Sequence, residues 1–291
     1  MQANRVKRIL GEGGLALGTH VGGIADPQIV EIIGHAGFDA AFIDMEHTSF
    51  DLRDVQLMVM AAERVGITPI VRTPGFDPAF ILRLLDMGVQ GIQVPHISDA
   101  RAAREAVKAV RYAPLGDRGM AGATRASDYG KVAVKQHSEQ SNHEITLAVV
   151  IEDLPAVAEI DAIASTDGID IVAVGPSDMS RALGVSGTAD HPKLVEVVQR
   201  VAEAVQKGGI ARLALPMNHP ALPRQRGPAP GARRRLLQLG AGARGADAEV
   251  DAGAGDGGAR AARVRPGVRE RPRVARRCEW AGDLKTESEA V

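Results

Sequence analysis

Short apolar runs alternate with amphipathic segments over the first 215 residues of the chain. The apolar runs are rich in Val and Ile, and most of them show no alternation of apolar and polar positions. Continuous apolar runs of this kind are typical of strands that are buried on both faces, as in a parallel sheet. The pattern predicts seven strands, over residues 15–21, 38–44, 68–73, 91–96, 146–152, 168–175 and 209–215.

The segments between these strands have the apolar spacing of helices. They cover residues 26–37, 51–66, 77–88, 99–112, 154–166 and 191–209. Several begin with Asp followed by Pro, a capping residue and a favoured first helical residue, and several end at Gly. Strands and helices that alternate in this way predict a parallel sheet with right-handed crossovers.

A (β/α)8 TIM barrel explains this alternation better than a doubly wound sheet does. No G-x-G-x-x-G sequence follows the first strand, as a dinucleotide-binding sheet would require. Polar residues recur instead at the ends of many strands, which is typical of a barrel.

The chain changes character near residue 216. From Arg212 to Val291 there is no Ile, Phe or Tyr, and 15 Arg and one Lys stand against nine acidic residues. Such a segment offers little apolar surface to offset the entropy of ordering it. We therefore predict a barrel over residues 1–215 and a disordered Arg/Ala/Gly/Pro-rich tail over residues 216–291. The barrel is then expected to be incomplete at its eighth strand and helix.

Charge and cysteine content argue against several classes of protein. The formal net charge of −1 gives no bulk attraction to nucleic acid or to a membrane surface. A single cysteine, Cys278, allows no internal disulfide and fits a reducing compartment. No apolar run approaches the ~20 residues that span a bilayer, and the first residues lack the apolar core of a signal peptide. A cytoplasmic protein is predicted.

Polar side chains follow five successive strands at their carboxyl ends. They are Asp44, Glu46 and His47 after the second strand, Arg72 after the third, His96 after the fourth, Glu152 and Asp153 after the fifth, and Ser177 and Asp178 after the sixth. In a barrel, the carboxyl ends of the strands surround one open face. The sequence therefore predicts a functional site at that face.

Glu152 and Asp178 are the candidates for metal ligands. Two carboxylates with open coordination positions suit Mg²⁺ or Mn²⁺. The alternative is that each carboxylate caps the helix that follows it. The Gly-Pro-Ser turn before Asp178 could also hold an anion with its backbone N–H groups.

His47 and Arg72 are candidates for acid–base and electrostatic catalysis. Imidazole titrates near neutral pH, and either Asp44 or Glu46 could orient the ring of His47 as a general base. Arg72 keeps its charge and could stabilise an enolate or phosphate oxyanion, or form an ion pair with a neighbouring carboxylate. His96 is expected to have a structural or supporting role.

A metal, a base and an arginine in one pocket fit proton abstraction next to a carbonyl group. Phosphoryl chemistry fits less well, because the chain has no P-loop and no other glycine-rich phosphate loop. None of the predicted strands contains a lysine, which disfavours a Schiff-base mechanism.

Six motifs stand in the order seen in one enzyme family. They are GFDAAFIDMEH, PIVRTP, LLDMGVQGIQVPHI, GDRGMAGATRASDYG, VVIE and GIDIVAVGPSDMS. Over residues 10–211 the chain resembles the class II pyruvate aldolases, in particular the 4-hydroxy-2-oxoheptanedioate and 2-dehydro-3-deoxyglucarate aldolases. The resemblance implies a retro-aldol cleavage of a small 4-hydroxy-2-oxo acid to pyruvate and an aldehyde. It also implies a metal-stabilised enolate, with Mg²⁺, Mn²⁺ or Co²⁺ as the cofactor.

The same resemblance assigns roles to the residues at the strand ends. It implies that His47 acts as the base through a water molecule and that Arg72 stabilises the transition state. Glu152 and Asp178 would bind the divalent metal.

Four further positions take roles from the resemblance. Backbone and side-chain groups around Gly175 and Ser177 would hold the pyruvate carboxylate, and Arg125 would contact an acidic or hydroxylated acceptor. Asp86 matches an aspartate that raises the basicity of the catalytic histidine. Because Asp86 ends a helix, on the closed side of its own barrel, we expect it to act across an interface in a homo-oligomer.

The chain departs from the family pattern in two places. Val150 stands where the family usually has a glutamine that contacts substrate. After Leu215 no glycine-flanked apolar strand follows, and the tail has the composition of GC-rich DNA translated in a shifted frame. Two alternatives stay open: an inactive or unstable frameshifted aldolase-like protein, and a CoA-thioester lyase of the citrate lyase β-like type. The Asp-Met-Glu-His motif argues against the second.

Overall fold

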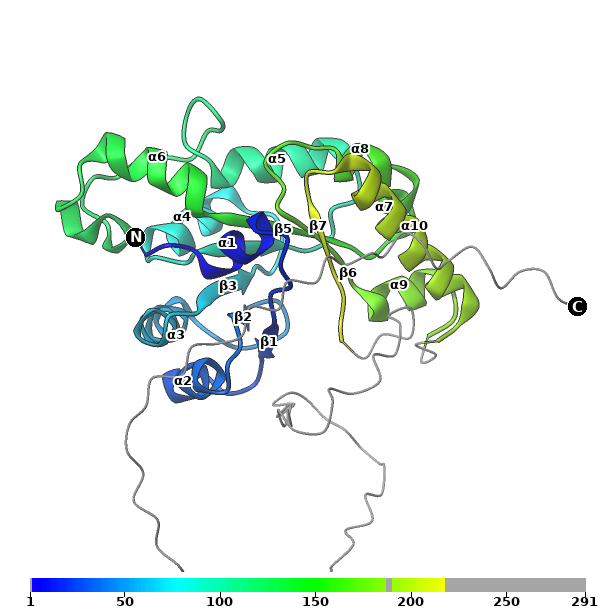
Figure 1. Cartoon of the computed structure of the whole chain (residues 1–291), viewed down its shortest axis with the longest axis horizontal. Helices are drawn as coiled ribbons and strands as arrows, with labels where there is room; N and C mark the ends of the chain where they lie inside the picture. The colour runs from blue at the N-terminus through cyan, green and yellow to red at the C-terminus, as the bar shows by residue number, and fades with distance from the viewer. Residues whose placement is uncertain (1, 187–189, 218–291) are drawn as a thin grey trace, which may run out of the picture. The chain divides into compact units, whose positions relative to one another are not determined.

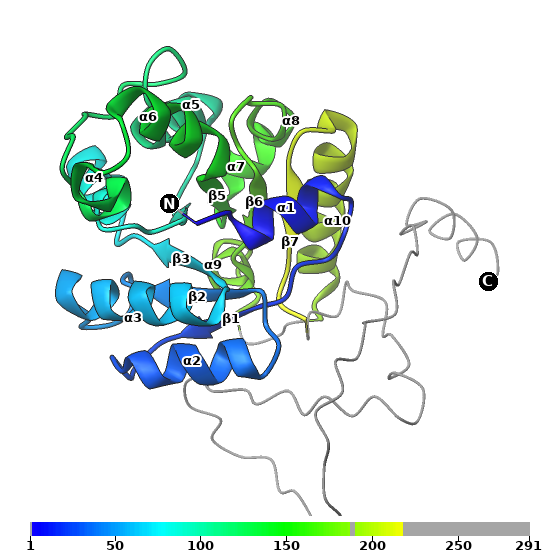
Figure 2. The same cartoon turned by 60° about the vertical axis from the view of Figure 1, so that its left-hand side comes forward.

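Residues 2–186 and 190–217 are described by the structure, which is a computed structural model. Within these residues, parallel strands form one seven-stranded sheet whose order follows the chain (Figure 1). The strands are β1 (Gly18–Val21), β2 (Ala40–Asp44), β3 (Thr68–Arg72), β4 (Gly91–Val94), β5 (Thr146–Ile151), β6 (Ile171–Val174) and β7 (Arg212–Ala214). The sheet is curled, so that one of its faces is concave (Figure 2).

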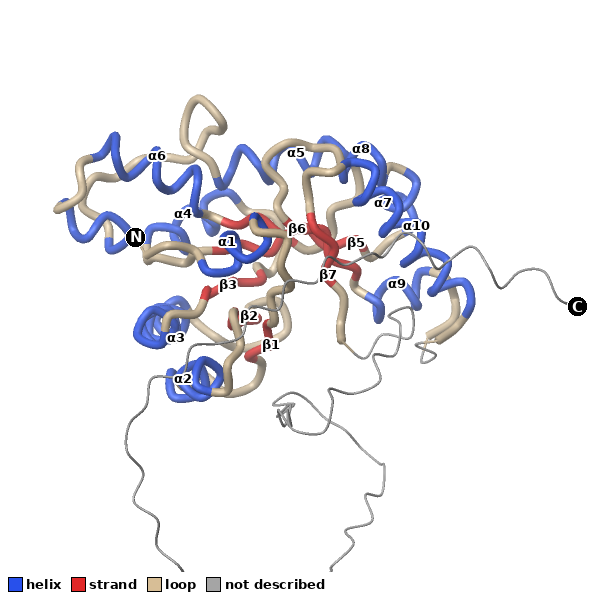
Figure 3. Tube along the Cα trace, in the orientation of Figure 1, coloured by secondary structure: helices blue, strands red, loops and turns tan. Residues whose placement is uncertain are grey.

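Helices connect the strands and lie around the sheet (Figure 3). They are α1 (Arg5–Gly11), α2 (Pro27–His35), α3 (Leu52–Val65), α4 (Pro78–Asp86), α5 (Ala100–Val110), α6 (Val134–Glu144), α7 (Leu154–Ala158), α8 (Ile160–Ala164), α9 (Pro176–Ala182) and α10 (Pro192–Gly208). A 3₁₀ helix, η1 (Arg125–Gly130), precedes α6.

The helix ends follow the sequence signals. Asp26 and Asp77 cap α2 and α4, and in both helices proline is the first residue. Asp51 and Asp54 form a reciprocal capping box at the start of α3. Gly66 ends that helix in the left-handed region, with φ 69°, where a side chain would be strained. These local signals fix where the crossover helices α2, α3 and α4 begin and where α3 ends.

The two faces of the sheet bury different residues. Val71 lies in the main core, between the sheet and the surrounding helices. Ile70, its neighbour in β3, lies in a second, smaller core on the concave face. Because side chains alternate along a strand, Arg72 also points to the concave face. Glu152, which follows the core residue Ile151, points the same way.

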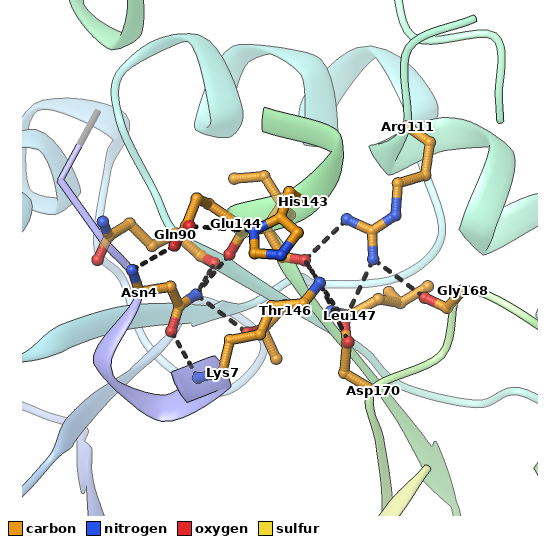
Figure 4. A network of polar contacts seen from close by, with 11 residues as sticks. Asn4, Lys7, Gln90, Arg111, His143, Glu144, Thr146, Leu147, Gly168 and Asp170 are labelled. Carbon is orange, nitrogen blue, oxygen red and sulfur yellow. Dashed lines mark hydrogen bonds and ion pairs between the residues drawn. The ribbon is translucent and has the colours of Figure 1, made fainter. Parts of the chain in front are cut away.

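Helix α1 closes the amino-terminal end of the concave face. Asn4, its buried N-cap residue, donates hydrogen bonds from Nδ2 to Gln90 O, Glu144 O and Thr146 Oγ1, at 2.9, 2.8 and 3.0 Å (Figure 4). Gln90 directly precedes β4, Glu144 ends α6, and Thr146 begins β5. Val6 of α1 packs into the smaller core. The carboxyl ends of the strands are thus the open end of the sheet.

All seven predicted strands are confirmed. The complete (β/α)8 barrel is not, because the described residues form a curled half-barrel in which β1 and β7 are the two edges. The segment in which an eighth strand is expected to be missing, and the rest of the tail beyond residue 217, lie outside the described residues. The segment 154–166, predicted as one helix, forms α7 and α8, and α1, α6 and α9 were not predicted. Within residues 2–186 and 190–217, no helix has the length and apolar character to cross a membrane.

Candidate active site

Arg72 is held between two carboxylates at the carboxyl ends of β2 and β3. Its Nε and Nη2 donate to the two carboxylate oxygens of Asp44 at 2.9 and 2.6 Å, and its Nη1 lies 3.2 Å from Glu46 Oε2. Burial acts to raise the pKa of Asp44, but the hydrogen bonds and charge of Arg72 outweigh it and the pKa is lowered. The guanidinium is therefore a fixed cation on the concave face.

His47 lies at the exposed rim beside this pair. Its side chain is 61% exposed, and its Nε2 lies 3.7 Å from Glu46 Oε2. Asp44 instead accepts the backbone N–H groups of Glu46 and His47 at 3.0 and 3.4 Å. Of the two carboxylates that were expected to orient the imidazole, Glu46 is the one near the ring. The carboxylate of Asp44 instead accepts hydrogen bonds from Arg72 and from the backbone of the turn that follows β2.

His96 joins the ends of β2 and β5. Its Nε2 lies 3.1 Å from Glu46 Oε1, and its Nδ1 lies 2.9 Å from Glu152 Oε1. The same Glu152 oxygen accepts the backbone N–H of His96 at 2.7 Å. The backbone of His96 is left-handed, with φ 55°, which is uncommon outside glycine. His96 was expected only to support the site. Instead, each of its ring nitrogens contacts a carboxylate, one of Glu46 and one of Glu152.

Glu152 is a buried carboxylate, with a side chain that is 4% exposed. Burial raises its pKa; the backbone N–H and the ring of His96 oppose the rise, and the charges of Glu46 and Asp178 add to it. Gly175 lies directly against this carboxylate, since a Cβ there would stand 2.7 Å from Glu152 Oε2. The second oxygen of Glu152 thus occupies space that a side chain at position 175 would fill.

Asp178 lies in the first turn of α9 with a side chain that is 36% exposed, 3.2 Å from the Arg181 guanidinium. Neither it nor Glu152 is a helix cap, because Asp153 caps α7 and Gly175 is the N-cap residue of α9. The alternative prediction, that Glu152 and Asp178 cap the helices that follow them, is therefore wrong.

The donor set fits a hard divalent cation. In the part of the chain that the structure describes, no three His, Cys, Asp or Glu side chains are arranged to hold a metal. Mg²⁺, however, takes only one or two carboxylates and keeps several waters. The negative charges of Glu46 and Asp178 both act to raise the pKa of Glu152. A cation bound between these carboxylates would offset that mutual repulsion.

Three further positions of the predicted site lie on β5 and at the start of α9. Val150 points to the concave face, and its Cγ1 would lie 3.3 Å from a Cβ at Gly175. Ser177 lies in the first turn of α9, next to Asp178. The structure thus brings Val150 and Gly175 together with Glu152, and Ser177 follows Gly175 by two residues in α9.

Comparison with known proteins identifies the family. The family model described as HpcH/HpaI aldolase/citrate lyase matches residues 21–226. The chain belongs to this family. A 5-keto-4-deoxy-D-glucarate aldolase from Enterobacter sp. (strain 638) is 38% identical over 186 residues, which are 64% of this chain and 72% of the relative. A 2-dehydro-3,6-dideoxy-6-sulfogluconate aldolase from Pseudomonas putida is 37% identical over 174 residues, 60% of this chain and 68% of the relative.

A solved structure of the HpcH/HpaI family has a similar fold. It is that of the HpcH/HpaI aldolase from Desulfitobacterium hafniense DCB-2, with a TM-score of 0.69 and 33% sequence identity. The match covers 73% of this chain and 82% of that chain. The family membership expected from the motifs is thus confirmed, and the aldolase names of the relatives favour the aldolase reading over the CoA-thioester lyase.

Two residues that the family resemblance singled out lie elsewhere in this chain. Asp86 ends α4 and accepts a hydrogen bond from Arg118 Nη2 at 2.8 Å. Arg125 donates to Met87 O at 2.9 Å and binds both carboxylate oxygens of Glu63. Neither contacts the cluster of Glu46, Arg72, His96 and Glu152 within the described residues, so their assigned roles stay predictions.

Two residues of the site were given too little weight in the sequence analysis. It considered Glu46 only as a partner of His47, although Glu46 also contacts Arg72 and His96. It did not single out Gln93, a buried polar residue on β4. The sequence does carry a signal for Gln93. It is the one polar residue in the apolar strand segment Gly-Ile-Gln-Val-Pro, where a buried polar side chain is unexpected.

Proposed function

We propose that this chain is a divalent-metal-dependent aldolase that cleaves a 4-hydroxy-2-oxo acid to pyruvate and an aldehyde. The observation that supports the proposal most is the linked cluster of Arg72, Glu46, His96 and Glu152 on the concave face. A fixed guanidinium beside buried carboxylates suits a reaction in which negative charge develops on a carbonyl oxygen. The membership of the chain in an aldolase family agrees with this chemistry.

Arg72 and His47 would share the work of charge stabilisation and proton transfer. Arg72, already oriented by Asp44, would stabilise the enolate oxygen without a change in its own geometry. His47, at the solvent-exposed rim, would take the proton of the C4 hydroxyl through a water molecule. The C4–C3 bond then breaks, the aldehyde leaves, and the same proton path protonates C3 to give pyruvate.

Glu152 and Asp178 would hold the divalent cation, which would supply Lewis-acid polarisation of the 2-oxo group. His96 would fix the Glu152 carboxylate through its backbone N–H and its ring. Gly175, which lies against this carboxylate, and Ser177, two residues further on in α9, would receive the pyruvate carboxylate. Mg²⁺ and Mn²⁺ are the ions that these donors favour.

A hydroxylated sugar acid is the substrate class that we propose, because both aldolase relatives are named for sugar-acid derivatives. We also propose a homo-oligomer, since Asp86 contacts Arg118 rather than the cluster of its own chain. Mixing inactive Asp86→Asn chains with inactive His47→Ala chains should restore part of the activity if the site is shared between subunits. No recovery in mixed oligomers would exclude this role for Asp86.

Proton exchange at C3 of pyruvate tests the proposal without a choice of aldehyde. The wild-type chain in D₂O should exchange these protons, followed by NMR, with Mg²⁺ or Mn²⁺ and should stop in EDTA. His47→Ala should lower the rate by roughly 10²–10⁴-fold, the usual contribution of a positioned base. Its affinity for Mn²⁺, measured by EPR, should stay unchanged because His47 is not assigned as a ligand.

His143→Ala is the matched control, because this histidine is also exposed but pairs with Glu144 on α6. It should exchange like the wild type. Full exchange in EDTA would contradict the metal assignment, and a loss of Mn²⁺ binding in His47→Ala would contradict the role of His47. A folded chain that shows no exchange with either metal would favour the inactive alternative.

A further inference from the structure

Gln93 lies on the concave face, beside the cluster described above. Its neighbours Ile92 and Val94 belong to the main core, so the side chain of Gln93 points the other way. In the parallel pairing of β3 and β4, Gln93 is the register partner of Arg72, and Arg72 is that of Asp44. The three side chains form one row across neighbouring strands.

The Gln93 amide is buried without a partner for its oxygen. The residue is 7% exposed, and its Oε1 is a buried atom that no described residue hydrogen-bonds. Burying an amide oxygen without a donor costs free energy, so native proteins rarely leave one in that state. Val150 on the adjacent strand β5 points to the same face and supplies no polar atom. A donor from a bound molecule would satisfy this oxygen.

The chemistry of an amide oxygen decides which part of a substrate it would meet. It can only accept a hydrogen bond, so it pairs with neither a carboxylate nor a 2-oxo group. A carboxylate or a 2-oxo group would instead accept hydrogen bonds from Arg72, the neighbour of Gln93 on β3. A hydroxyl is the group of a hydroxylated 2-oxo acid that donates. The C4 hydroxyl gives its proton away in the proposed reaction, which leaves a hydroxyl that does not react.

We propose that Gln93 is a substrate-binding residue whose amide oxygen accepts a hydrogen bond from a non-reacting hydroxyl on the aldehyde portion of the substrate. This inference rests on the proposed aldolase function. It makes Gln93 a determinant of specificity for hydroxylated, sugar-acid substrates over simple 4-hydroxy-2-oxo acids. Sites that hydrogen-bond a substrate hydroxyl discriminate against analogues that lack it.

Two substrates separate this role from a general one. 5-Keto-4-deoxy-D-glucarate carries a further hydroxyl on its aldehyde portion, whereas 4-hydroxy-2-oxopentanoate has only the reacting one. Gln93→Leu should lower kcat/KM for the first by roughly 2- to 13-fold, the range that one neutral hydrogen bond gives. It should leave kcat/KM for the second, and the exchange of pyruvate protons, at the wild-type values.

Thermal unfolding supplies a readout that does not depend on activity. Because Oε1 of Gln93 has no partner in the described residues, Gln93→Leu should keep or raise the wild-type Tm. Gln90→Leu is the matched control. Gln90 directly precedes β4, and its Nε2 donates to Gln2 O at 2.7 Å. This control variant should lower Tm and leave the ratio of the two kcat/KM values unchanged.

Three results would overturn the inference. The first is an equal loss on both substrates in Gln93→Leu, and the second is no loss on either. The third is a fall in Tm as large as that of Gln90→Leu, which would make Gln93 structural. A wild-type chain without exchange and without cleavage would refute the proposed function instead, and the inference with it.

Discussion

Replacing Gly175 with alanine tests how closely the Glu152 carboxylate is held. The new Cβ would lie 2.7 Å from Glu152 Oε2, 3.1 Å from Glu152 Cβ and 3.3 Å from Val150 Cγ1. To reach 3.0 Å, below which real Cβ contacts essentially do not occur, Oε2 must move by at least 0.3 Å (3.0 − 2.7). The backbone at Gly175, with φ −89° and ψ 91°, gives alanine no left-handed strain, so the effect is one of contact alone.

The carboxylate cannot simply turn away, because its other oxygen accepts the His96 backbone N–H at 2.7 Å and faces the ring at 2.9 Å. Overpacking of this kind costs about 1–3 kcal/mol. For a protein of this size that lowers Tm by about 2–4 °C per kcal/mol. Metal ligands tolerate displacements of only about 0.2 Å, so the affinity for Mn²⁺ should fall by roughly 10- to 100-fold.

Mn²⁺ titration by EPR, with thermal unfolding of the same samples, measures both effects. Gly22→Ala is the control, because a Cβ there meets nothing closer than Thr48 Cγ2 at 3.8 Å. It should bind Mn²⁺ with wild-type affinity. Wild-type affinity and Tm in Gly175→Ala would refute the reasoning, since they would mean that Glu152 is free to move.

Two further predictions concern stability. Asp44→Asn should lower the free energy of unfolding by about 1.5–3 kcal/mol at neutral pH. Because the pKa of Asp44 is lowered in the fold, this advantage of the wild type is complete above the unfolded pKa of about 3.9 and is lost as pH falls below it. Denaturant unfolding of both chains as a function of pH checks this, and a difference that is constant from neutral to acid pH would contradict it. Asn4→Ala should cost about 2–4 kcal/mol in the same assay, because it removes a cap and leaves buried acceptors unpaired. The exposed Lys135→Ala should cost under about 0.5 kcal/mol, and an equally small effect of Asn4→Ala would refute this account.

The strands were predictable because each is a continuous apolar run, which a doubly covered sheet requires. Helix α6 was not, because its sequence Val-Lys-Gln-His-Ser-Glu-Gln-Ser-Asn-His-Glu has no apolar stripe and buries only His137 and Ser141. Helices α1 and α9 are seven residues long, too short to show a helical period.

The sequence predicted where the site lies, but not which of its side chains contact one another. Strand ends placed Asp44, Arg72 and Glu152 on one rim, because that follows from the parallel topology. The pairing of partners did not follow. The left-handed backbone of His96, which turns its N–H and ring onto Glu152, leaves no mark in the sequence. Arg125 was assigned by motif alone, and its salt bridge with Glu63, 62 residues away, was invisible.

The hydrogen bonds of Asn4 also bear on the order in which the chain folds. Asn4 is separated by 142 residues from Thr146 and by 86 from Gln90, so its contacts are among the most non-local in the fold. Ribosomes add about 5–20 residues per second, so α1 waits roughly 7–28 s (142 residues at those rates) before β5 has been synthesised. During that interval Val6 has no smaller core to enter, because Ala148 of that core has yet to be made. Helix α1 is therefore synthesised before the strands that it packs against, and it can dock only after β5 has been made.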